Sequence, residues 1–269
     1  MMVKRGGVHQ YTFPASRLAT FDTGRITARK NLMRAMLEVD VTEARLLLRR
    51  YRRAHNTQAS LLAWVIRCVA LLAKEHPRIH GLRKGKRSVV VFDEVDVSVL
   101  VERQVDGEGV PLPVVIRRAG EKSVSEIDLE IRTAQQQGIP QNDEYVLGEN
   151  RYARWIRWYV LLPAFLRRFA WNIILRKPML VKAMAGTVAV SSVGMMGQIR
   201  GWAMPGSFLP LSLLLGSVVK KPGVAPDGRV TIREYLHLSV AIDHDVVDGA
   251  PATRFIHQLV EMLEKGEGL

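Results

Sequence analysis

The sequence predicts an α/β fold, and three observations carry that prediction. Residues 88–92 and 95–101 are rich in valine, as β-strands commonly are. Residues 61–74 are apolar on nearly every side, which is typical of a buried central helix. Residues 238–242 alternate like a half-buried strand, and the helical pattern of residues 250–265 follows them after a short polar turn. Strand and helix patterns that alternate along one chain favour helices packed against a sheet.

The remaining elements are expected between those segments. Further strands are expected over residues 32–41, 110–116, 209–219 and 230–241, with a hairpin turn at residues 225–229. Thr57 or Ser60 opens the central helix, and Thr42 is placed to cap the helix that follows the first of these strands. Ser123 and Glu126 form a capping-box pattern for a further helix. The stretch before the first of these strands has a mixed pattern that predicts no element.

The composition is that of a basic globular protein. The chain has 269 residues, 48% of them hydrophobic, and a formal net charge of +13 at pH 7. Such a chain suits nucleic acid, a membrane surface or an anionic substrate such as a phosphate of coenzyme A. We expect no nucleic acid partner, because the sequence has no zinc-finger spacing and no RNA-recognition signature. The single cysteine, Cys68, lies in an apolar helical run, which indicates a buried thiol in a reducing cytoplasm.

His244 is the candidate catalytic residue. It stands at the end of a predicted strand, and Asp248 follows it four residues later. A histidine with a nearby carboxylate can act as an oriented general base. From the residues alone, a structural histidine–carboxylate pair is the more common explanation of this spacing. No metal site is expected.

The segment from Asp243 to Ala250 resembles the active-site motif of the dihydrolipoamide acyltransferases, the E2 components of 2-oxo-acid dehydrogenase complexes. Chloramphenicol acetyltransferase shares their fold and the His-x-x-x-Asp-Gly core of the motif. The resemblance implies a chloramphenicol acetyltransferase-like α/β fold, a mixed sheet with helices on one side, and His244 as the catalytic base. One residue departs from the E2 pattern, because Asp245 stands where those enzymes usually have arginine.

Two further site residues follow from the resemblance. Residues 186–194 resemble the E2 strand whose first serine stabilises the oxyanion, and that serine corresponds to Ser191. A strand-end serine bonded to backbone is the alternative for Ser191. The family also pairs an arginine with the aspartate of the motif, which implies that Arg17, or Arg25 as the alternate, pairs with Asp248. A solvated surface arginine is the alternative there.

The chain is expected to hold one catalytic domain with an addition. A loose basic arm is expected at residues 1–12 and an acyltransferase domain over residues 13–269. Residues 1–10 lack the apolar core of a secretory signal, and a cytoplasmic location is expected. A basic helical insertion at about residues 139–183 departs from the E2 pattern.

The insertion mixes basic residues with Trp and Leu, and no acidic residue occurs between Glu149 and Asp227. Pro163 and the pair Arg167-Arg168 interrupt its apolar runs, so neither half reaches the ~20 residues of a membrane-spanning helix. Basic residues mixed with Trp and Leu fit an interfacial amphipathic helix pair. The alternative is that these helices cover a subunit surface or line a substrate entrance.

The resemblance implies a CoA-dependent acyltransferase that moves an acyl group directly between a CoA thioester and a thiol or hydroxyl acceptor. Direct transfer agrees with the lack of a Gly-x-Ser-x-Gly motif. Family members form trimers with each active site at a subunit interface, so His244 and Ser191 are expected from different subunits of a homotrimer or higher multiple. No lipoyl attachment is expected in this chain, and the acceptor is a small molecule or a lipoyl group. The alternatives are a non-catalytic oligomeric scaffold and an enzyme with peripheral membrane contact that uses a membrane-associated acceptor.

Overall fold

The structure is a computed structural model that describes residues 17–102, 111–136, 159, 161–193, 200–225 and 227–269. It also describes the backbone of residues 2–5, 8–11, 103–105 and 108–110. The strands are β1 Met2–Arg5, β2 Val8–Tyr11, β3 Leu32–Asp40, β4 Leu82–Lys84, β5 Ser88–Val90, β6 Val97–Val105, β7 Glu108–Ile116, β8 Val188–Ser192, β9 Leu211–Val224 and β10 Val230–Asp243. The α-helices are α1 Arg17–Thr27, α2 Thr42–Ala54, α3 Leu61–Glu75, α4 Val124–Gln136, α6 Ala164–Leu175, α7 Pro178–Ala185 and α8 Gly249–Lys265. Pro77–His80 and Ala119–Glu121 form short 3-10 helices.

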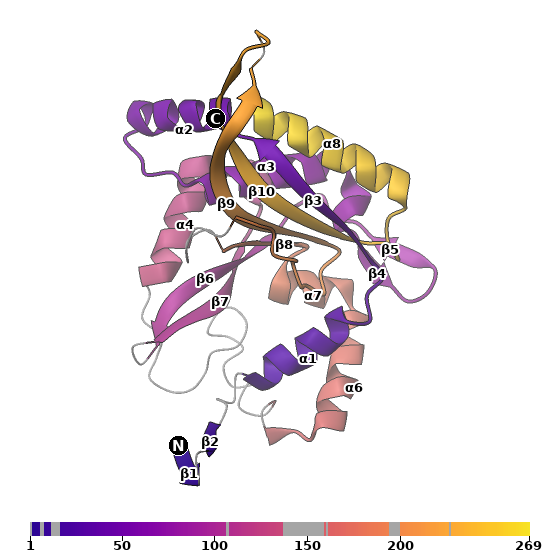
Figure 1. The fold of residues 1–269 in the computed structure, drawn as a ribbon. Coiled ribbons are helices and arrows are strands. Elements are labelled where there is room, and N and C mark those ends of the chain that lie inside the picture. Colours follow the sequence, from indigo (N-terminus) through magenta and orange to yellow (C-terminus); the bar gives the residue numbers. More distant parts are fainter. Residues whose placement is uncertain are drawn as a thin grey trace.

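A six-stranded mixed sheet forms the centre of the molecule (Figure 1). Its strand order is β3-β10-β9-β8-β6-β7. β8 runs parallel to β6 and to β9, and the other neighbours are antiparallel. This confirms the mixed sheet that the resemblance implied. Two small hairpins, β1–β2 and β4–β5, lie outside the sheet. The first of them falls within the predicted loose arm, which therefore contains regular structure.

The main core lies between one face of the sheet and four helices, α2, α3, α4 and α8. The alternating residues Leu211, Leu213 and Leu215 of β9 face this core, as do Leu238, Val240 and Ile242 of β10. α3 is buried on most sides, as its sequence predicts, and Trp64 and Ile66 are fully enclosed. Cys68 is also buried, and burial raises the pKa of its thiol to about 12, which confirms its interpretation as a small core residue.

A smaller core lies on the opposite face of the sheet. Leu82, Val181, Ala185 and Leu209 form it, and Ala189 of β8 packs against them. Ala189 alternates with Val188 and Val190, which belong to the main core, so this second cluster must lie on the other side of β8. The expectation of helices on one side is therefore correct for the main layer, and α7 is an addition on the other face.

Two of the three predicted helix caps are present in the structure. The Ser60 hydroxyl accepts from the Ala63 amide at 3.1 Å, and Ser123 and Glu126 bond reciprocally as a capping box. The prediction for Thr42 is wrong, because its hydroxyl donates to Asp40 at 2.6 Å and accepts from the Glu234 amide at 2.8 Å. Thr42 thus fastens the start of α2 to β10 instead of capping the helix.

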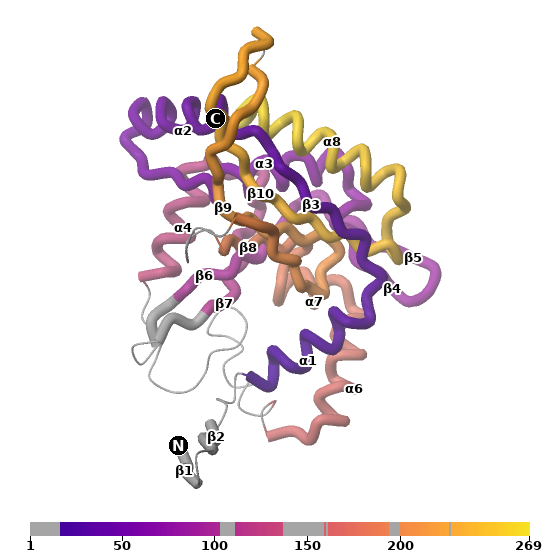
Figure 2. The backbone as a smooth tube through the Cα atoms, viewed as in Figure 1, coloured from indigo at the N-terminus to yellow at the C-terminus, as the bar shows by residue number. Residues whose placement is uncertain are grey.

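α1 and α6 lie side by side and are joined by a buried polar cluster (Figure 2). The Asp22 carboxylate accepts from the Arg167 guanidinium at 2.7 Å and from the Tyr159 hydroxyl at 2.5 Å. The Trp171 indole donates to the Tyr159 hydroxyl at 2.9 Å. Burial and the bond to Asp22 raise the pKa of Tyr159 to about 12. These bonds attach the helical part of the predicted insertion to α1, a helix that the sequence did not predict.

The part of the predicted insertion that the structure describes contains α6 and most of α7. Residues 139–158, including Tyr152 and Trp155, lie outside the described residues. Pro163 precedes α6, as the interrupted apolar pattern predicts. In the described part of the chain, no helix has the length and apolar character needed to cross a membrane.

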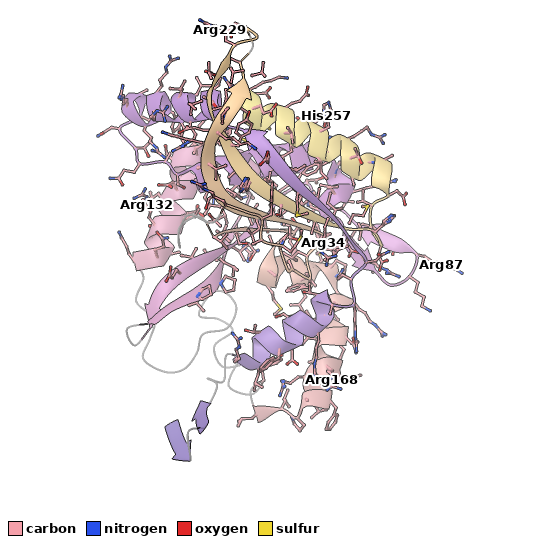
Figure 3. The ribbon with its side chains drawn as sticks, in the orientation of Figure 1. Arg34, Arg87, Arg132, Arg168, Arg229 and His257 are labelled. Atoms are coloured by element: carbon pink, nitrogen blue, oxygen red, sulfur yellow. The ribbon has the colours of Figure 1, made fainter. Side chains whose placement is uncertain are left out.

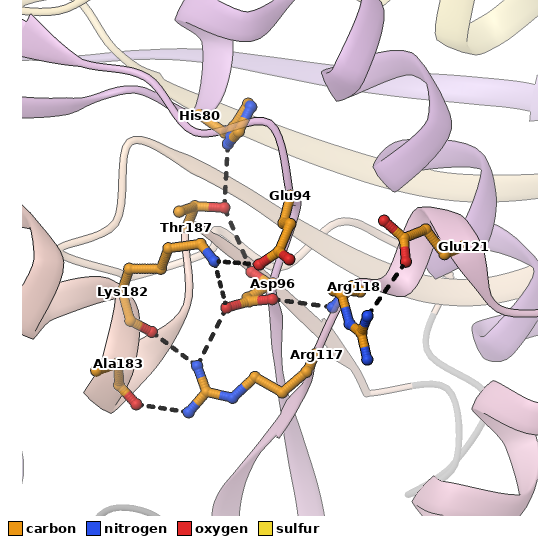
Figure 4. A network of polar contacts seen from close by, with 9 residues as sticks. All are labelled: His80, Glu94, Asp96, Arg117, Arg118, Glu121, Lys182, Ala183 and Thr187. Carbon is orange, nitrogen blue, oxygen red and sulfur yellow. Dashed lines mark hydrogen bonds and ion pairs between the residues drawn. The ribbon is translucent and has the colours of Figure 1, made fainter.

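A polar network around Asp96 places the start of β8 (Figure 4). The buried Asp96 carboxylate pairs with Arg117 and Lys182, each at 3.1 Å, and its carbonyl accepts from the Thr187 amide at 2.8 Å. Gly186 has a φ of +74°, and a Cβ there would meet the Asp96 carbonyl oxygen at 2.5 Å. Only glycine fits this close approach, which explains the glycine that precedes the candidate oxyanion strand.

His80 is buried beside this network. Its Nδ1 lies 3.1 Å from the Thr187 hydroxyl, and its Nε2 has no hydrogen-bond partner among the described residues. Burial, together with the nearby Lys182 ammonium, lowers the pKa of His80 to about 4. The folded protein therefore holds His80 neutral at neutral pH.

The low pKa of His80 predicts an acid-labile fold. The unfolded chain binds a proton near pH 6.5 and the folded chain only near pH 4, so the contribution of neutral His80 is present above pH 6.5 and is lost as the pH falls towards 4. Between pH 7 and 4.5 this single group should remove about 2–3 kcal/mol of unfolding free energy. Urea unfolding at pH 7 and at pH 4.5 measures this loss of unfolding free energy. In the His80→Gln variant the loss between the two pH values should be smaller by about 2–3 kcal/mol. His257→Gln, at an exposed histidine, should behave as the wild type; equal losses in all three proteins would contradict the assignment.

Removal of the Asp22–Arg167 pair is expected to lower the stability of the protein strongly. In Arg167→Met the buried Asp22 carboxylate loses its cation, and we expect a loss of about 3 kcal/mol in unfolding free energy. Amide hydrogen exchange should become faster in α1 and α6 and stay slow in α3. The neighbouring exposed Arg168→Met is the matched control and should change the stability by less than about 0.5 kcal/mol.

Candidate active site

The predicted catalytic corner joins the end of β10 to the start of α8. Asp243 is the last residue of β10, and Asp248 directly precedes α8. The amides of Val246 and Val247 donate to the Asp243 carbonyl at 3.0 and 3.1 Å, which closes the turn. The His244 amide donates to the Asn31 carbonyl at 2.7 Å. Backbone bonds thus fix the histidine both within the corner and against the segment before β3.

A buried ion pair stabilises the first residue of the corner. The Asp243 side chain is fully buried and pairs with the Lys30 ammonium. Its other oxygen accepts from the Asp245 amide at 3.1 Å. Sequence reasoning missed Lys30, because 213 positions separate it from Asp243 and a lone lysine before a strand carries no signal.

The two predicted side chains of the motif, His244 and Asp248, are exposed in the single chain. Asp248 has an extended backbone, with φ −75° and ψ 165°, and occupies the position before α8. A histidine that stands open to solvent is accessible to a substrate. His244 does not line either of the two pockets that lie beside the corner. Within one chain, the corner therefore presents a candidate base that is open to solvent.

Ser191 of β8 and His244, at the end of β10, belong to the same part of the sheet but lie at different levels along its strands. Ser191 of β8 is level with Leu214 of β9, and Leu214 is level with Ser239 of β10. Five positions separate Ser239 from His244, which is about 16 Å of extended chain. The reacting atoms of one acyl group cannot contact two side chains that far apart. Within one chain, the structure does not bring His244 and Ser191 together.

Arg17, the predicted partner of Asp248, is the first residue of α1. Its guanidinium carbon lies 5.9 Å from the centre of the Phe21 ring. Arg25 is exposed near the end of the same helix. The pairing of Asp248 with either arginine stays a prediction.

Asp245, the residue that departs from the E2 pattern, has a specific partner. Its carboxylate pairs with Arg83 of β4 at 2.6 Å, and the Arg83 Nε donates to the Gly85 carbonyl at 2.9 Å. A shallow pocket of about 320 Å³ opens there, lined by Arg83, Lys86, Arg87, Ser88, Val89 and Asp245. Asp245 therefore holds the basic β4–β5 hairpin, which carries Arg87 at its turn (Figure 3), against the corner.

The fold and the corner together define a class, the acyltransferases with a chloramphenicol acetyltransferase-like sheet. A sequence profile of the 2-oxoacid dehydrogenases acyltransferase catalytic domain matches residues 29–141 and 180–269. The chain belongs to this family. The profile does not match residues 142–179, which include α6.

Relatives and solved structures agree with this assignment. The lipoamide acyltransferase component of the branched-chain alpha-keto acid dehydrogenase complex of Bacillus subtilis is 22% identical over 85% of this chain and 46% of its own length. The chain thus spans about half the length of the curated relatives it matches. Dihydrolipoamide acetyltransferase of Azotobacter vinelandii has a TM-score of 0.64 at 20% identity, covering 96% of this chain and 92% of that one. Chloramphenicol acetyltransferase has a TM-score of 0.51 at 14% identity, covering 94% and 96%, which confirms the fold class.

The Asp245–Arg83 pair predicts that stability depends on opposite charges at these two positions. Asp245→Arg should place a third cation beside Arg83 and Lys86 and lower the unfolding free energy by about 1 kcal/mol, a small value because both partners are partly exposed. Adding Arg83→Asp should recover most of that loss, because it restores an opposite-charge pair. Urea unfolding of the single and double variants measures both values. A double variant as unstable as the sum of its single changes would show that the pair contributes nothing.

Proposed function

We propose that this chain is a CoA-dependent acyltransferase with His244 as its general base. One observation carries the proposal: the family motif places His244 at an exposed corner whose backbone is bonded on both sides. A base must keep its geometry while it remains accessible to the substrate, and this corner meets both conditions. The net charge of +13 suits a substrate that carries several phosphates.

In the proposed reaction, His244 accepts the proton of an acceptor thiol or hydroxyl as that group attacks the thioester carbonyl of acyl-CoA. The carbon–oxygen double bond becomes an oxyanion, to which the Ser191 hydroxyl donates. Collapse of the tetrahedral intermediate breaks the carbon–sulfur bond, and the departing CoA thiolate takes the proton from protonated His244. No covalent enzyme intermediate forms. Asp248 orients the corner through its arginine partner and does not relay the proton.

The proposed site needs two copies of the chain. The levels of Ser191 and His244 lie about 16 Å apart along the strands of one copy, which supports a site shared between copies. A homotrimer or higher multiple in which His244 faces Ser191 of a neighbouring copy completes the site. In the Azotobacter vinelandii enzyme, a serine, a histidine and an asparagine have been studied for roles in catalysis, and the last two are four positions apart. His244 and Asp248 have the same spacing, which supports a role for Asp248 in the position of that asparagine.

The acceptor that the family favours is a dihydrolipoyl group on another domain or chain, or a small thiol in the cytoplasm. A second candidate is an acceptor held at a membrane. It is favoured by the large apolar side chains that α6 and its neighbours expose, beside basic residues and without any acid between residues 150 and 226. These exposed side chains are Leu161, Phe165, Leu166, Phe169, Ile173 and Met179.

Release of CoA from a panel of acyl-CoA thioesters with dihydrolipoamide as acceptor tests the proposal. His244→Ala should lower the rate at least about 100-fold, since it removes the base. Ser191→Ala should lower it by a comparable factor, since it removes an oxyanion donor. Equal rates for the wild type and His244→Ala would end the proposal. An oligomer with no turnover on any thioester would favour the non-catalytic scaffold.

Mixing the two inactive variants tests the shared site. After dissociation and reassembly, mixed oligomers of His244→Ala and Ser191→Ala contain some interfaces with both residues intact, and these should restore a measurable fraction of the rate. Each variant reassembled alone is the control. Mixed oligomers that form without any recovery would contradict a site built from two copies.

A further inference from the structure

A second and larger pocket adjoins the corner on the side of α6. Its volume is about 610 Å³, within the range of small-molecule sites. It is lined by Lys30, Leu82, Arg83, Gly85, Lys86, Asn172, Leu175, Arg176, Val181 and Phe208. Lys30 belongs both to this pocket and to the buried pair with Asp243, so the pocket lies next to the proposed active site.

The pocket combines positive charge with an apolar wall. Lys30 and Arg83 are already paired with carboxylates of the corner. Lys86 and Arg176 form no ion pair with any residue that the structure describes, and the described lining contains no Asp or Glu. Leu82, Leu175, Val181 and Phe208 form the apolar part of the lining. Two uncompensated cations beside an apolar wall suit a ligand with an anionic group and an apolar body.

The exposed face of α6 extends the apolar wall beyond the pocket. Phe165 and Phe169 are 66% and 64% exposed. Asn172 and Arg176 line the pocket and follow Phe165 by seven and eleven residues, a spacing that puts all four on one side of the helix. An aliphatic chain whose head occupies the pocket can therefore continue along this apolar stripe.

Part of this pocket lies outside the residues that the family profile matches. Asn172, Leu175 and Arg176 come from the segment that the family profile does not match. The Asp22–Arg167 pair fixes α6 in place, so these three residues stand on an anchored helix. The pocket thus combines residues of this unmatched segment with the β4–β5 hairpin and with Lys30, Val181 and Phe208.

We propose that this pocket binds the head of an anionic amphiphile, an organic phosphate that carries an aliphatic chain. The phosphate lies between Lys86 and Arg176, and the chain lies against Leu175 and Phe208 and leaves along Phe169. The ligand is either a lipid of a bilayer or a dissolved alkyl phosphate, because both offer the same chemistry. Binding at this pocket does not require acyl transfer, so it can fail or succeed independently of the proposed function.

Calorimetric titration of the full chain with dodecyl phosphate, below its micelle concentration, tests the proposal. The pocket variant Lys86→Ser with Arg176→Ser should bind at least about tenfold more weakly, because both uncompensated cations are removed. The matched control, Arg87→Ser with Arg168→Ser, removes the same charge from the same hairpin and helix outside the pocket. It should keep the affinity within about twofold. Figure 3 labels both control residues.

The nature of the ligand is tested with three further probes. Inorganic phosphate should bind more weakly than dodecyl phosphate, and dodecyltrimethylammonium should not bind. Equal affinity of the wild type and the pocket variant for dodecyl phosphate would overturn the proposal, as would equal binding of the ammonium compound. Sedimentation with phosphatidylglycerol vesicles that is lost in the pocket variant would identify a bilayer lipid as the source. Binding of dodecyl phosphate without such sedimentation would identify a dissolved ligand.

Discussion

The buried pair between Lys30 and Asp243 is the interaction on which the rest of the site depends. Asp243 is fully enclosed, and a buried carboxylate without a cation costs several kcal/mol. By pairing with Lys30, it joins the end of β10 to the segment just before β3, where Asn31 holds the His244 backbone. The same lysine forms part of the larger pocket. One ion pair therefore sets the position of the proposed base and of the pocket beside it.

Local patterns allowed the sequence to predict the sheet and the four core helices. The alternation in β10, the apolar surface of α3 and the capping box before α4 each depend on neighbours within a few positions. α1 was missed because the bond that attaches it to α6, from Arg167 to Asp22, spans 145 positions. Thr42 was misassigned for a similar reason, since its hydroxyl is taken by Asp40 and by Glu234 of a distant strand.

The site was predicted through its motif and not through its surroundings. His244, Asp248 and Ser191 could be named because the spacing of the motif and the strand pattern resemble those of a known family. Lys30 and Arg83 could not, because an ion pair between distant positions leaves no trace in a single sequence. The residue that departs from the E2 pattern, Asp245, gained its explanation only from the position of Arg83.

The position of the insertion in the topology determines which part of this fold can change. It lies in the connection between α4 and β8, and β8 is fixed at its start by Gly186 and Thr187 against Asp96. Gly186 and Thr187 both follow residues 142–179, which the family profile does not match. That segment can therefore differ in length and chemistry without shifting the strand that carries Ser191. A binding surface can thus be added between α4 and β8 while the contacts that hold the sheet stay the same.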